Sequence, residues 1–409
     1  MKRRTDIEGL RALAVLAVLL FHAGVPGVSG GYVGVDIFFV LSGFLITSLL
    51  VAERRTTGSV SLSDFYARRI RRILPVSGLV AVCSLVASWI WLEPLRLRGV
   101  ANDVLAVATF SSNFVFANRG ADYLQSALPP SPLQHYWSLA VEEQFYIVWP
   151  ALIALVCIGV GQQSRIGIRL RIGLTAAIAS LASFIACMLL MESSQPWAFF
   201  APHTRAFELS LGALLAVAPV ASKKVSRHVV TLLSWVGMAG IVGSVMLFDE
   251  KTTFPGPWAL VPVCATVLVL CGGNATAWAP DVVLRLSPFQ WMGSRSYSAY
   301  LWHWPILIIA APALDRTLSV RDGLVCLVIA LALSELSYRF VENPVRRNMS
   351  LKGVRAFVLA LGLIAIVSGS AVLARNNPPS MSAGVDATAP TLVTTTTLDP
   401  ILPSTTLAP

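Results

Sequence analysis

The sequence predicts an all-α, polytopic integral membrane protein, and three observations carry that prediction. Hydrophobic residues make up 56% of the 409 residues, and charged residues make up 13%, about half the fraction usual in soluble proteins. The mean hydropathy is +0.71, and repeated apolar runs are long enough to cross a bilayer. Together these features exclude a cytosolic enzyme, a secreted domain and a disordered chain. The net charge is +10. In a membrane protein such an excess of Lys and Arg usually lies in the cytoplasmic loops, so it does not indicate a nucleic-acid partner.

Apolar runs of spanning length follow one another along the chain. They lie at 8–25, 32–52, 74–93, 137–160, 171–191, 203–221, 229–248, 255–272, 297–313, 323–342 and 354–374. The first run resembles a signal peptide, but Asp6, Glu8 and Arg11 interrupt the approach to it and no small-residue cleavage site follows His22. We therefore predict a bundle of ten membrane helices that begins with a retained first helix, plus an eleventh transmembrane helix near the C-terminus.

A further apolar run, at 99–118, decides the topology. It carries Asn102, Asp103 and Asn113, which are costly in contact with lipid. If the N-terminus is cytoplasmic and this run does not cross, Lys and Arg divide 22 inside to 8 outside, whereas a crossing run divides them 15 to 15. Because Lys and Arg accumulate on the cytoplasmic side, we predict that residues 94–136 and the C-terminal tail are both extracytoplasmic.

Three parts of the chain are expected from this pattern. Residues 1–347 would form the ten-helix membrane domain, residues 348–375 would hold the eleventh helix, and residues 376–409 would be a disordered extracytoplasmic linker. From Pro378 to Pro409 there are six prolines, eight threonines and no aromatic residue. Such a composition cannot bury a core and is typical of an extended stalk.

The cysteines and histidines show no metal-binding pattern. Each cysteine lies in an apolar run and none forms a CxxC pair, so we expect small hydrophobic packing residues. They are Cys83, Cys157, Cys187, Cys264, Cys271 and Cys326. The five histidines likewise lack the spacing of metal ligands. We therefore predict neither a metal site nor a permanently bound cofactor.

Arg11 and His22 are predicted to share one face of the first helix. Eleven steps of about 100° make three turns plus about 20°, and the rise is about 16 Å, half of the hydrocarbon core. Arg11 would lie toward the cytoplasm and His22 in the outer half. This arrangement suits a reaction whose donor enters from inside, although an interfacial histidine and a snorkelling arginine would have the same spacing.

The segment 31–47 contains a carboxylate within the second helix. Asp36 could orient the imidazole of His22, as carboxylates do for catalytic histidines, or it could simply complement the helix dipole. Gly31, Gly34 and Gly43 would allow neighbouring helices to approach closely.

Four arginines lie in the segment 65–75, which we expect to be an inner loop. Arg68 and Arg71, and likewise Arg69 and Arg72, are three residues apart, and such a cluster can bind phosphate with bidentate geometry. We therefore name all four as candidate ligands for a phosphate-bearing donor. Anchoring of the cytoplasmic loop, or contact with anionic lipids, is the alternative explanation.

Further candidates lie where later helices enter from the outside. In the segment 135–146, Glu142 and Glu143 are about 100° apart on a helix, so at most one of them faces inward fully, and the other must meet a cavity or a cation. Glu142 is a catalytic candidate. Candidate substrate-lining residues are His135, Glu143, Tyr297 and His303, although aromatic-rich stretches of this kind are also typical of membrane interfaces.

These ordered motifs resemble the membrane acyltransferase-3 family of bacteria. The similarity covers residues 6–347 and includes DIEGLRALAV, GGYVGVDIFFVLSGFLIT, FYARRIRRILP, HYWSLAVEEQFY, SYSAYLWHWP and RFVENP. The resemblance implies ten membrane helices and transfer of an acyl group, usually acetyl, from cytoplasmic acyl-CoA to a hydroxyl of a cell-envelope glycan or lipid. It also implies that His22 and Arg11 are essential and that Glu142 and the arginine cluster are functional.

The resemblance also accounts for the C-terminal end. It places the chain in the bacterial inner membrane, among membrane lipids, with a cytoplasmic N-terminus. Relatives with an eleventh helix carry an extracytoplasmic SGNH hydrolase-like domain that completes the transfer. This sequence ends at Pro409 without a GDS motif, so we expect either a chain truncated before that domain or one that acts without it, with an SGNH-type domain or protein as a candidate partner.

The expected mechanism uses both ends of the first helix. The arginine cluster would hold the pyrophosphate of CoA at the cytoplasmic mouth, and the thioester would pass Arg11 to reach His22. His22 would act as a general base on the acceptor hydroxyl or would itself be acylated first, with Asp36 or Glu142 holding its tautomer. A transporter or flippase with the same intramembrane charges is the alternative function. A phosphate-binding cluster at one mouth only favours the enzyme.

Overall fold

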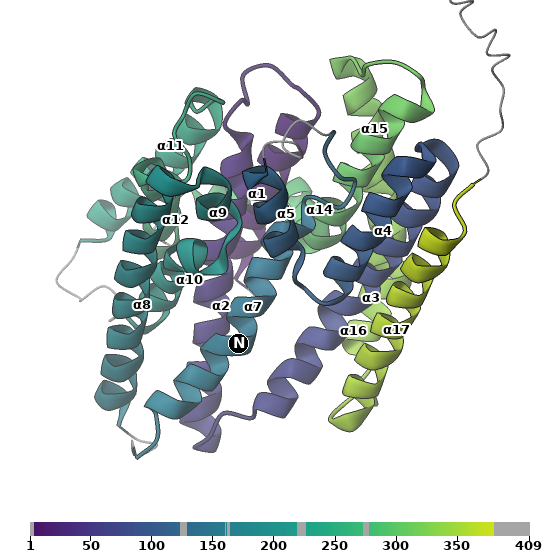
Figure 1. Cartoon of the computed structure of the whole chain (residues 1–409). Helices are drawn as coiled ribbons and strands as arrows, with labels where there is room; N and C mark the ends of the chain where they lie inside the picture. Colours follow the sequence, from purple (N-terminus) through teal and green to yellow (C-terminus); the bar gives the residue numbers. More distant parts are fainter. Residues whose placement is uncertain are drawn as a thin grey trace, which may run out of the picture. The chain divides into compact units, whose positions relative to one another are not determined.

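The fold is known from a computed structural model that describes residues 4–122, 129–159, 161, 164–218, 226–272 and 278–379. Within these ranges the regular structure is helical and contains no strand, which confirms the predicted all-α class. Residues 1–378 form one compact unit (Figure 1). The predicted linker, apart from its first four residues, lies outside the described residues.

The helices follow the predicted apolar runs, with several boundaries shifted. In chain order they are α1 (Thr5–His22), η1 (Gly31–Val33), α2 (Gly34–Thr57), α3 (Leu62–Trp91), α4 (Pro94–Ala108), α5 (Ser112–Ala121), α7 (Tyr136–Val156), α8 (Arg165–Ser193), α9 (Gln195–Phe200), α10 (Pro202–Val217), α11 (Arg227–Leu247), η2 (Pro257–Ala259), α12 (Leu260–Gly272), α13 (Asp281–Leu284), α14 (Ser287–Ala313), α15 (Val320–Ser337), the π-helical η3 (Tyr338–Glu342), α16 (Asn343–Arg347) and α17 (Val354–Asn376).

Among the described residues, seven helices are long and apolar enough to cross a membrane: α2, α3, α7, α8, α11, α15 and α17. α1 has 18 residues but carries three charged side chains, and α10 has only 16 residues. The structure therefore supports a multi-pass helical membrane protein, while the count of ten helices plus one stays a prediction.

Helix α1 lies inside the bundle and packs against α2 and α14. It ends after His22 because Gly24 adopts φ +72°, a left-handed conformation that suits glycine. Its contact with α2 is close because a Cβ on Gly34 would collide with the carbonyl oxygen of Ala14. On the other face of α2, Gly43 lies directly against the backbone of Leu209 in α10. These contacts confirm the predicted close approach of helices at the glycines of the second helix.

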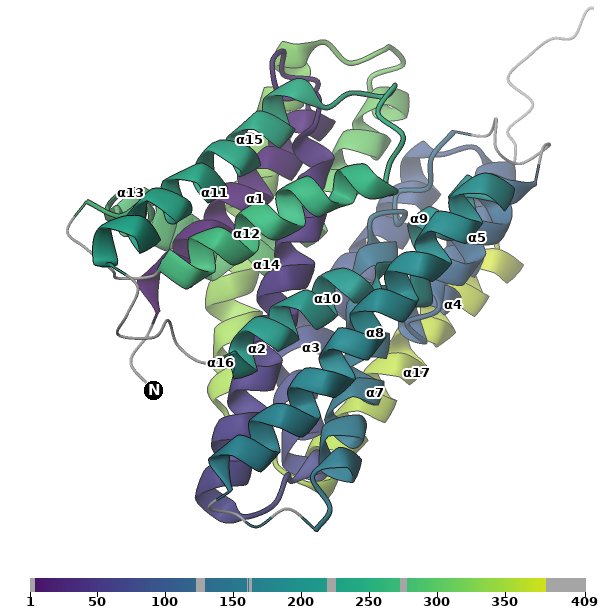
Figure 2. The same ribbon diagram turned by 90° about the vertical axis from the view of Figure 1, so that its left-hand side faces the viewer.

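The remaining helices pack on two sides of this centre. Figure 2 shows α8, α10 and α2 side by side and α11 packed with α12. On the other side, α17 lies along α3 and α4 (Figure 1). Thus α17 belongs to the same packed unit as the preceding helices.

The six cysteine thiols are all free: three are buried, Cys83 is partly buried, and Cys264 and Cys271 are exposed.

The ambiguous run 99–118 is divided between two short helices. α4 and α5 have 15 and 10 residues, so they are about 22 and 15 Å long, less than the roughly 30 Å of the hydrocarbon core. The chain turns between them at Phe110, whose φ is +52°. Inside the fold, Asp103 pairs with Arg119 at 2.7 Å, and Asn113 donates to the carbonyl oxygen of Phe200 at 3.2 Å. Asp103 and Asn113 are therefore paired within the protein, whereas the buried hydroxyl of Ser112 has no partner among the described residues.

The end of α17 lies at the same end of the bundle as the start of α4. Arg375 donates to the side-chain oxygen of Asn102 at 3.4 Å, and the indole of Trp89 donates to the carbonyl oxygen of Asn377 at 3.1 Å. This placement agrees with the expectation that residues 94–136 and the end of the eleventh helix share one side. Which face of the membrane that side meets stays a prediction.

The prediction of a loop at 65–75 is wrong, because these residues belong to the first turns of α3. The side chain of Ser61 caps this helix by accepting from the backbone N–H of Asp64. Arginine and leucine are good helix formers, and α3 continues through Pro75. The four arginines therefore lie on a helix, where spacing decides which side each one faces.

Candidate active site

Two cavities lie along α1, one beside Arg11 and one beside His22. The arginine cavity has a volume of about 80 Å³ and is lined by Arg11, Arg69, Arg72 and Glu142 among others. The histidine cavity has a volume of about 320 Å³ and is lined by His22, Asp36, His135 and Arg205 among others. Only Val35 and Tyr300 line both cavities, so they form the wall between them. Arg11 and His22 both belong to the one helix Thr5–His22, as predicted, and each lines one of the two cavities.

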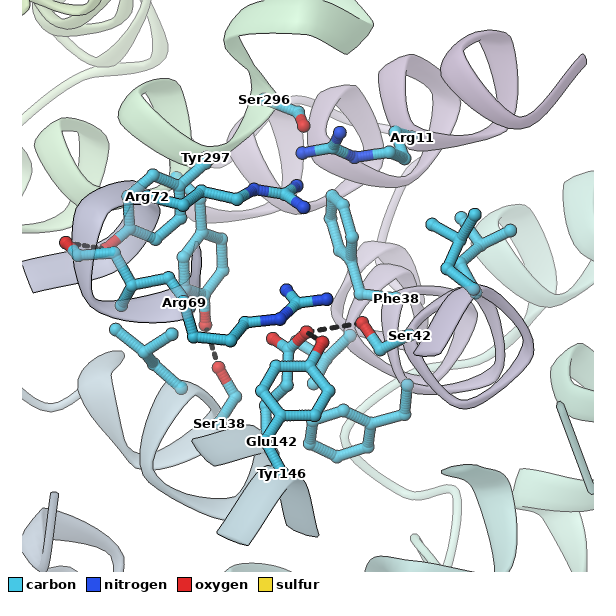
Figure 3. A pocket seen from close by; sticks show the side chains of 17 residues that line it. Arg11, Phe38, Ser42, Arg69, Arg72, Ser138, Glu142, Tyr146, Ser296 and Tyr297 are labelled. Carbon is cyan, nitrogen blue, oxygen red and sulfur yellow. Dashed lines mark hydrogen bonds between the residues drawn. The ribbon is translucent and has the colours of Figure 1, made fainter. Parts of the chain in front are cut away.

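Three guanidinium groups define the arginine cavity. Figure 3 shows Arg11 of α1 and Arg69 and Arg72 of α3 turning toward one space beside Phe38. Arg69 lies over the ring of Tyr146, with its guanidinium carbon 4.4 Å from the ring centre. Within the described part of the chain, none of the three forms an ion pair or a hydrogen bond. Three partly buried cations share this cavity with a single carboxylate, Glu142, so the cavity has a net positive charge that suits an anionic ligand.

The other two arginines of the predicted cluster point elsewhere. Arg68 is half exposed and pairs with Glu53 at 3.0 Å. Arg71 is buried, and its guanidinium donates to the carbonyl oxygen of Leu351 at 2.6 Å, next to the start of α17. The reason is helical geometry, because residues 69 and 72 share one face of α3 while residues 68 and 71 share another. Only one of the two expected arginine pairs therefore meets the cavity.

The adjacent glutamates of α7 also separate, as the sequence predicts. Glu142 lines the arginine cavity and accepts hydrogen bonds from Ser42 and Tyr146 (Figure 3). Glu143 lines neither cavity, and its Oε1 is buried without a partner among the described residues. Tyr297 lines the arginine cavity and donates to the carbonyl oxygen of Ile73 at 2.8 Å, which ties α14 to α3.

A chain of hydrogen bonds fixes the tautomer of His22. His303 Nδ1 lies 2.5 Å from the carbonyl oxygen of Tyr300, and a carbonyl can only accept, so this nitrogen carries the proton. The opposite nitrogen, Nε2, then accepts in a neutral imidazole, and it lies 3.0 Å from Nδ1 of His22. We infer that His22 donates from Nδ1 and keeps an unprotonated Nε2. That nitrogen has the lone pair that a general base or a nucleophile needs.

His135, which is buried, contributes a second imidazole to the cavity that His22 lines. Its Nε2 lies 3.1 Å from the carbonyl oxygen of Leu301, so this nitrogen donates. Its Nδ1 is buried and has no partner in the described ranges. The carbonyl oxygen of His135 accepts from the hydroxyl of Tyr300 at 3.0 Å, and that hydroxyl also meets Ser138 at 2.7 Å. The wall residue Tyr300 is therefore fixed by α7.

The expected role of Asp36 as the partner of His22 is wrong in this structure. Asp36 Oδ1 accepts from Arg205 at 2.9 Å, and Arg205 also pairs with Glu208 at 2.9 Å. Glu142 is likewise occupied, so neither proposed carboxylate orients the imidazole. His303 takes that position. Burial explains the difference, because the fully buried guanidinium of Arg205 requires carboxylates beside it.

Sequence analysis missed Arg205, Glu208 and the orienting role of His303. The eight outer Lys and Arg of the predicted charge division include Arg205, which lies within α10; without it the division is 22 to 7. A cation and a carboxylate three residues apart in an apolar run were the available signal. Among the described residues, no three His, Cys, Asp or Glu side chains are placed to hold a metal ion.

Comparison with known proteins identifies the family of this chain. A family model described as an acyltransferase domain matches residues 4–339. The peptidoglycan O-acetyltransferase OatA of Listeria monocytogenes is 31% identical over 84% of this chain and 56% of its own length. The putative peptidoglycan O-acetyltransferase YrhL of Bacillus subtilis is 32% identical over 86% and 55%, and the O-acetyltransferase OatA of Staphylococcus aureus is 30% identical over 86% and 58%.

The chain spans little more than half the length of these curated relatives. No solved structure matches it. The family model nevertheless covers most of the chain and includes α1, both cavities and every helix that lines them. The chain therefore belongs to the membrane acyltransferase-3 family.

Proposed function

We propose that this protein transfers an acyl group, in particular acetyl, from acyl-CoA to a hydroxyl of a cell-envelope glycan. The family and the names of the relatives support O-acyl transfer, and peptidoglycan is the acceptor named for two of them. The observation that carries the proposal is the pair of cavities on α1. One holds three arginines that have no ion pair among the described residues, and the other holds an imidazole with a free lone pair, with Val35 and Tyr300 between them.

The arginine cavity would take the donor. Arg69 and Arg72 would bind phosphate groups of acyl-CoA with charge-assisted hydrogen bonds, and Arg11 would guide the same molecule along α1. The topology predicted from the Lys and Arg distribution places the start of α3 at the cytoplasmic face, where acyl-CoA is present. The acyl thioester must then pass Val35 and Tyr300 to reach His22.

His22 would carry out the chemistry by one of two routes. As a general base, Nε2 takes the proton of the acceptor hydroxyl while its oxygen attacks the thioester carbonyl; the C–S bond breaks and the proton passes to the thiolate. As a nucleophile, Nε2 attacks the thioester carbonyl first and CoA leaves as the thiolate; the acceptor oxygen then attacks the acyl group, the bond between Nε2 and the acyl carbon breaks, and the hydroxyl proton passes to the thiolate. In both routes Nε2 of His303 accepts the hydrogen bond from the Nδ1–H of His22, which keeps the lone pair on Nε2 of His22.

The surroundings of the enzyme follow from the same proposal. The protein would lie in the bacterial inner membrane with its N-terminus in the cytoplasm and its tail outside, and it would be in contact with membrane lipids. Residues 1–347 would supply the transfer machinery, residues 348–375 the eleventh helix and residues 376–409 a linker. An extracytoplasmic SGNH-type domain or protein would be a natural partner for delivering the acyl group.

Transfer by the purified full chain tests the proposal directly. The protein would be reconstituted in vesicles, supplied with radiolabelled acetyl-CoA and soluble peptidoglycan fragments, and assayed for label in the glycan. We expect transfer by the wild type, a rate lower by about a hundredfold or more in His22→Ala, and saturable acetyl-CoA binding by both. Failure of acetyl-CoA to bind the wild type, or a transfer rate above about a tenth of the wild-type rate in His22→Ala, would contradict the proposal.

A further inference from the structure

We propose that a hollow between α4 and α17 binds the phosphate-bearing headgroup of an anionic phospholipid. The hollow is separate from both cavities on α1, so this inference goes beyond the proposed acyl transfer. Four side chains line it: Arg98 and Asn102 of α4, and Arg375 and Asn376 of α17. The two helices pack against each other (Figure 1), although 273 residues of sequence separate Asn102 from Arg375. The fold therefore brings two cations and two amides to one place, which we call the α4–α17 hollow.

Every side chain that lines the α4–α17 hollow can donate hydrogen bonds. The guanidinium of Arg375 donates to the side-chain oxygen of Asn102 at 3.4 Å, so the amide nitrogen of Asn102 keeps its protons for a ligand. Arginine forks bind two phosphate oxygens at once with charge-assisted hydrogen bonds. The described residues that line the hollow include no carboxylate. The hollow, with a volume of about 380 Å³, therefore offers donors and positive charge to an anion.

The two arginines of the α4–α17 hollow lack the counter-ion that a neighbouring arginine has. Asp103, the residue after Asn102, is buried and pairs with Arg119 at 2.7 Å, away from the hollow. In the described part of the chain neither Arg98 nor Arg375 forms an ion pair. Two cations that line one hollow repel each other, and an anion bound between them would remove that cost.

The surroundings of the α4–α17 hollow favour a lipid as the source of the phosphate. The indole of Trp89, in the last turn of α3, is partly exposed and donates to the carbonyl oxygen of Asn377 at 3.1 Å. Tryptophans of this kind are enriched where a helix leaves the bilayer. Val372 and Leu373, within one turn of Arg375, are exposed apolar residues. A phospholipid would place its phosphate between the arginines and its acyl chains against this apolar surface, which a soluble phosphate would leave uncovered.

Lipid binding by the purified full chain tests this inference. Native mass spectrometry would give the dissociation constants of phosphatidylglycerol and of phosphatidylcholine with the same acyl chains. We expect phosphatidylglycerol to bind the wild type more tightly, because the choline cation is repelled by the arginines. The double variant Arg98→Gln, Arg375→Gln should weaken phosphatidylglycerol binding by about tenfold or more, the scale of lost hydrogen bonds to a charged group. It should leave phosphatidylcholine binding nearly unchanged.

A matched double variant controls for net charge. Arg96→Gln, Arg321→Gln removes two positive charges from residues that do not line the α4–α17 hollow, so phosphatidylglycerol binding should persist. The double variant Arg98→Lys, Arg375→Lys keeps the charge but not the forks, and it should give an intermediate affinity. Equal binding of the two lipids by the wild type, or equal losses in the two glutamine double variants, would overturn the inference.

Competition separates the lipid from soluble sources of phosphate. Inorganic phosphate and a glycerol phosphate oligomer would be added to the complex of the wild type with phosphatidylglycerol. We expect neither to displace the lipid at equal concentration, because neither has acyl chains to cover Val372 and Leu373. Displacement by either would overturn the assignment to a phospholipid. Acetyl-CoA binding and acetyl transfer, measured in the same preparations, report on the fold and on the proposed function independently of these results.

Discussion

The two cavities hold opposite charge on either side of one wall. Three arginines and a single carboxylate, Glu142, line the arginine cavity, whereas three carboxylates and a single arginine, Arg205, line the histidine cavity. The two cavities share only Val35 and Tyr300. A phosphate-bearing donor therefore finds complementary charge on one side of the wall only, which gives the proposed transfer a direction.

The arginines themselves show why pairing matters more than residue type. Arg205 is fully buried, pairs with two carboxylates and lies within 5.5–5.7 Å of four aromatic ring centres. Arg69 and Arg72 are not paired among the described residues. A buried charge that has its counter-ion holds helices together, whereas the partly buried Arg69 and Arg72 keep donors that a ligand could use. The contrast fits a structural role for Arg205 and the proposed donor-binding role for the other two.

The largest expected effect is the loss of the reacting nitrogen of His22. His22→Ala should lower acyl transfer by about 10²–10⁴-fold, the usual contribution of a positioned base, while acetyl-CoA still binds the arginine cavity. His228→Ala is the matched control, because His228 is exposed at the start of α11. Transfer rates above about a tenth of the wild-type rate in His22→Ala would remove this residue from the chemistry.

A smaller effect is expected from the residue that orients His22. His303→Ala removes the acceptor of the Nδ1 proton, so His22 can place its proton on either nitrogen. We expect kcat to fall by about tenfold or more, since an incorrect tautomer is costly in histidine catalysis, with little change in the KM for acetyl-CoA. His303→Gln, whose amide oxygen can accept the same proton, should recover part of kcat. A purely structural role for His303 would instead lower protein yield and both substrate affinities together.

The next effect concerns the donor alone. Arg69→Ala and Arg72→Ala should each raise the KM for acetyl-CoA by about tenfold, the scale of a lost hydrogen bond to a charged group, and should change the acceptor KM much less. Arg68→Ala is the matched control on the next face of α3, where Arg68 pairs with Glu53 in a half-exposed position. Equal changes in all three variants would indicate membrane anchoring and would weaken the comparison of the cavities.

Much of this arrangement could be predicted because it depends on spacing within one helix. The eleven-residue interval from Arg11 to His22 places both on one stripe whatever surrounds them, and the adjacent glutamates must diverge for the same reason. The glycines of the second helix were likewise interpretable, since a residue without a side chain permits contact with a neighbouring backbone. Local periodicity therefore fixes which residues share a face.

The partners on other helices could not be predicted in this way. Arg205 lies 169 residues after Asp36, and His303 lies 281 residues after His22, so no local pattern links either pair. Asp36 is expected beside the imidazole only by analogy with catalytic histidines. Because α10 packs against α2, Asp36 forms its ion pair with Arg205. The sequence also could not show that α3 begins at Leu62, which decides that only two of the four arginines face the cavity.

The last test asks which side of the membrane each end of the bundle faces, and its cysteine variants should leave activity unchanged. Its result decides whether the arginine cavity opens toward the cytoplasm. Single cysteines would replace Glu93, Thr317 and Asn348 in a background without the six native cysteines, and intact cells would be treated with a membrane-impermeant maleimide. Thr317 lines a surface hollow with Arg96 at the α4 end, whereas Asn348 lies near Leu351, which binds Arg71 at the start of α3. Because the excess of Lys and Arg lies at the α3 start, we expect labelling at 93 and 317 but not at 348, with activity unchanged. Labelling at 348 alone would mean that the arginine cavity faces the outside. A cytoplasmic acyl-CoA could then not reach Arg69 and Arg72.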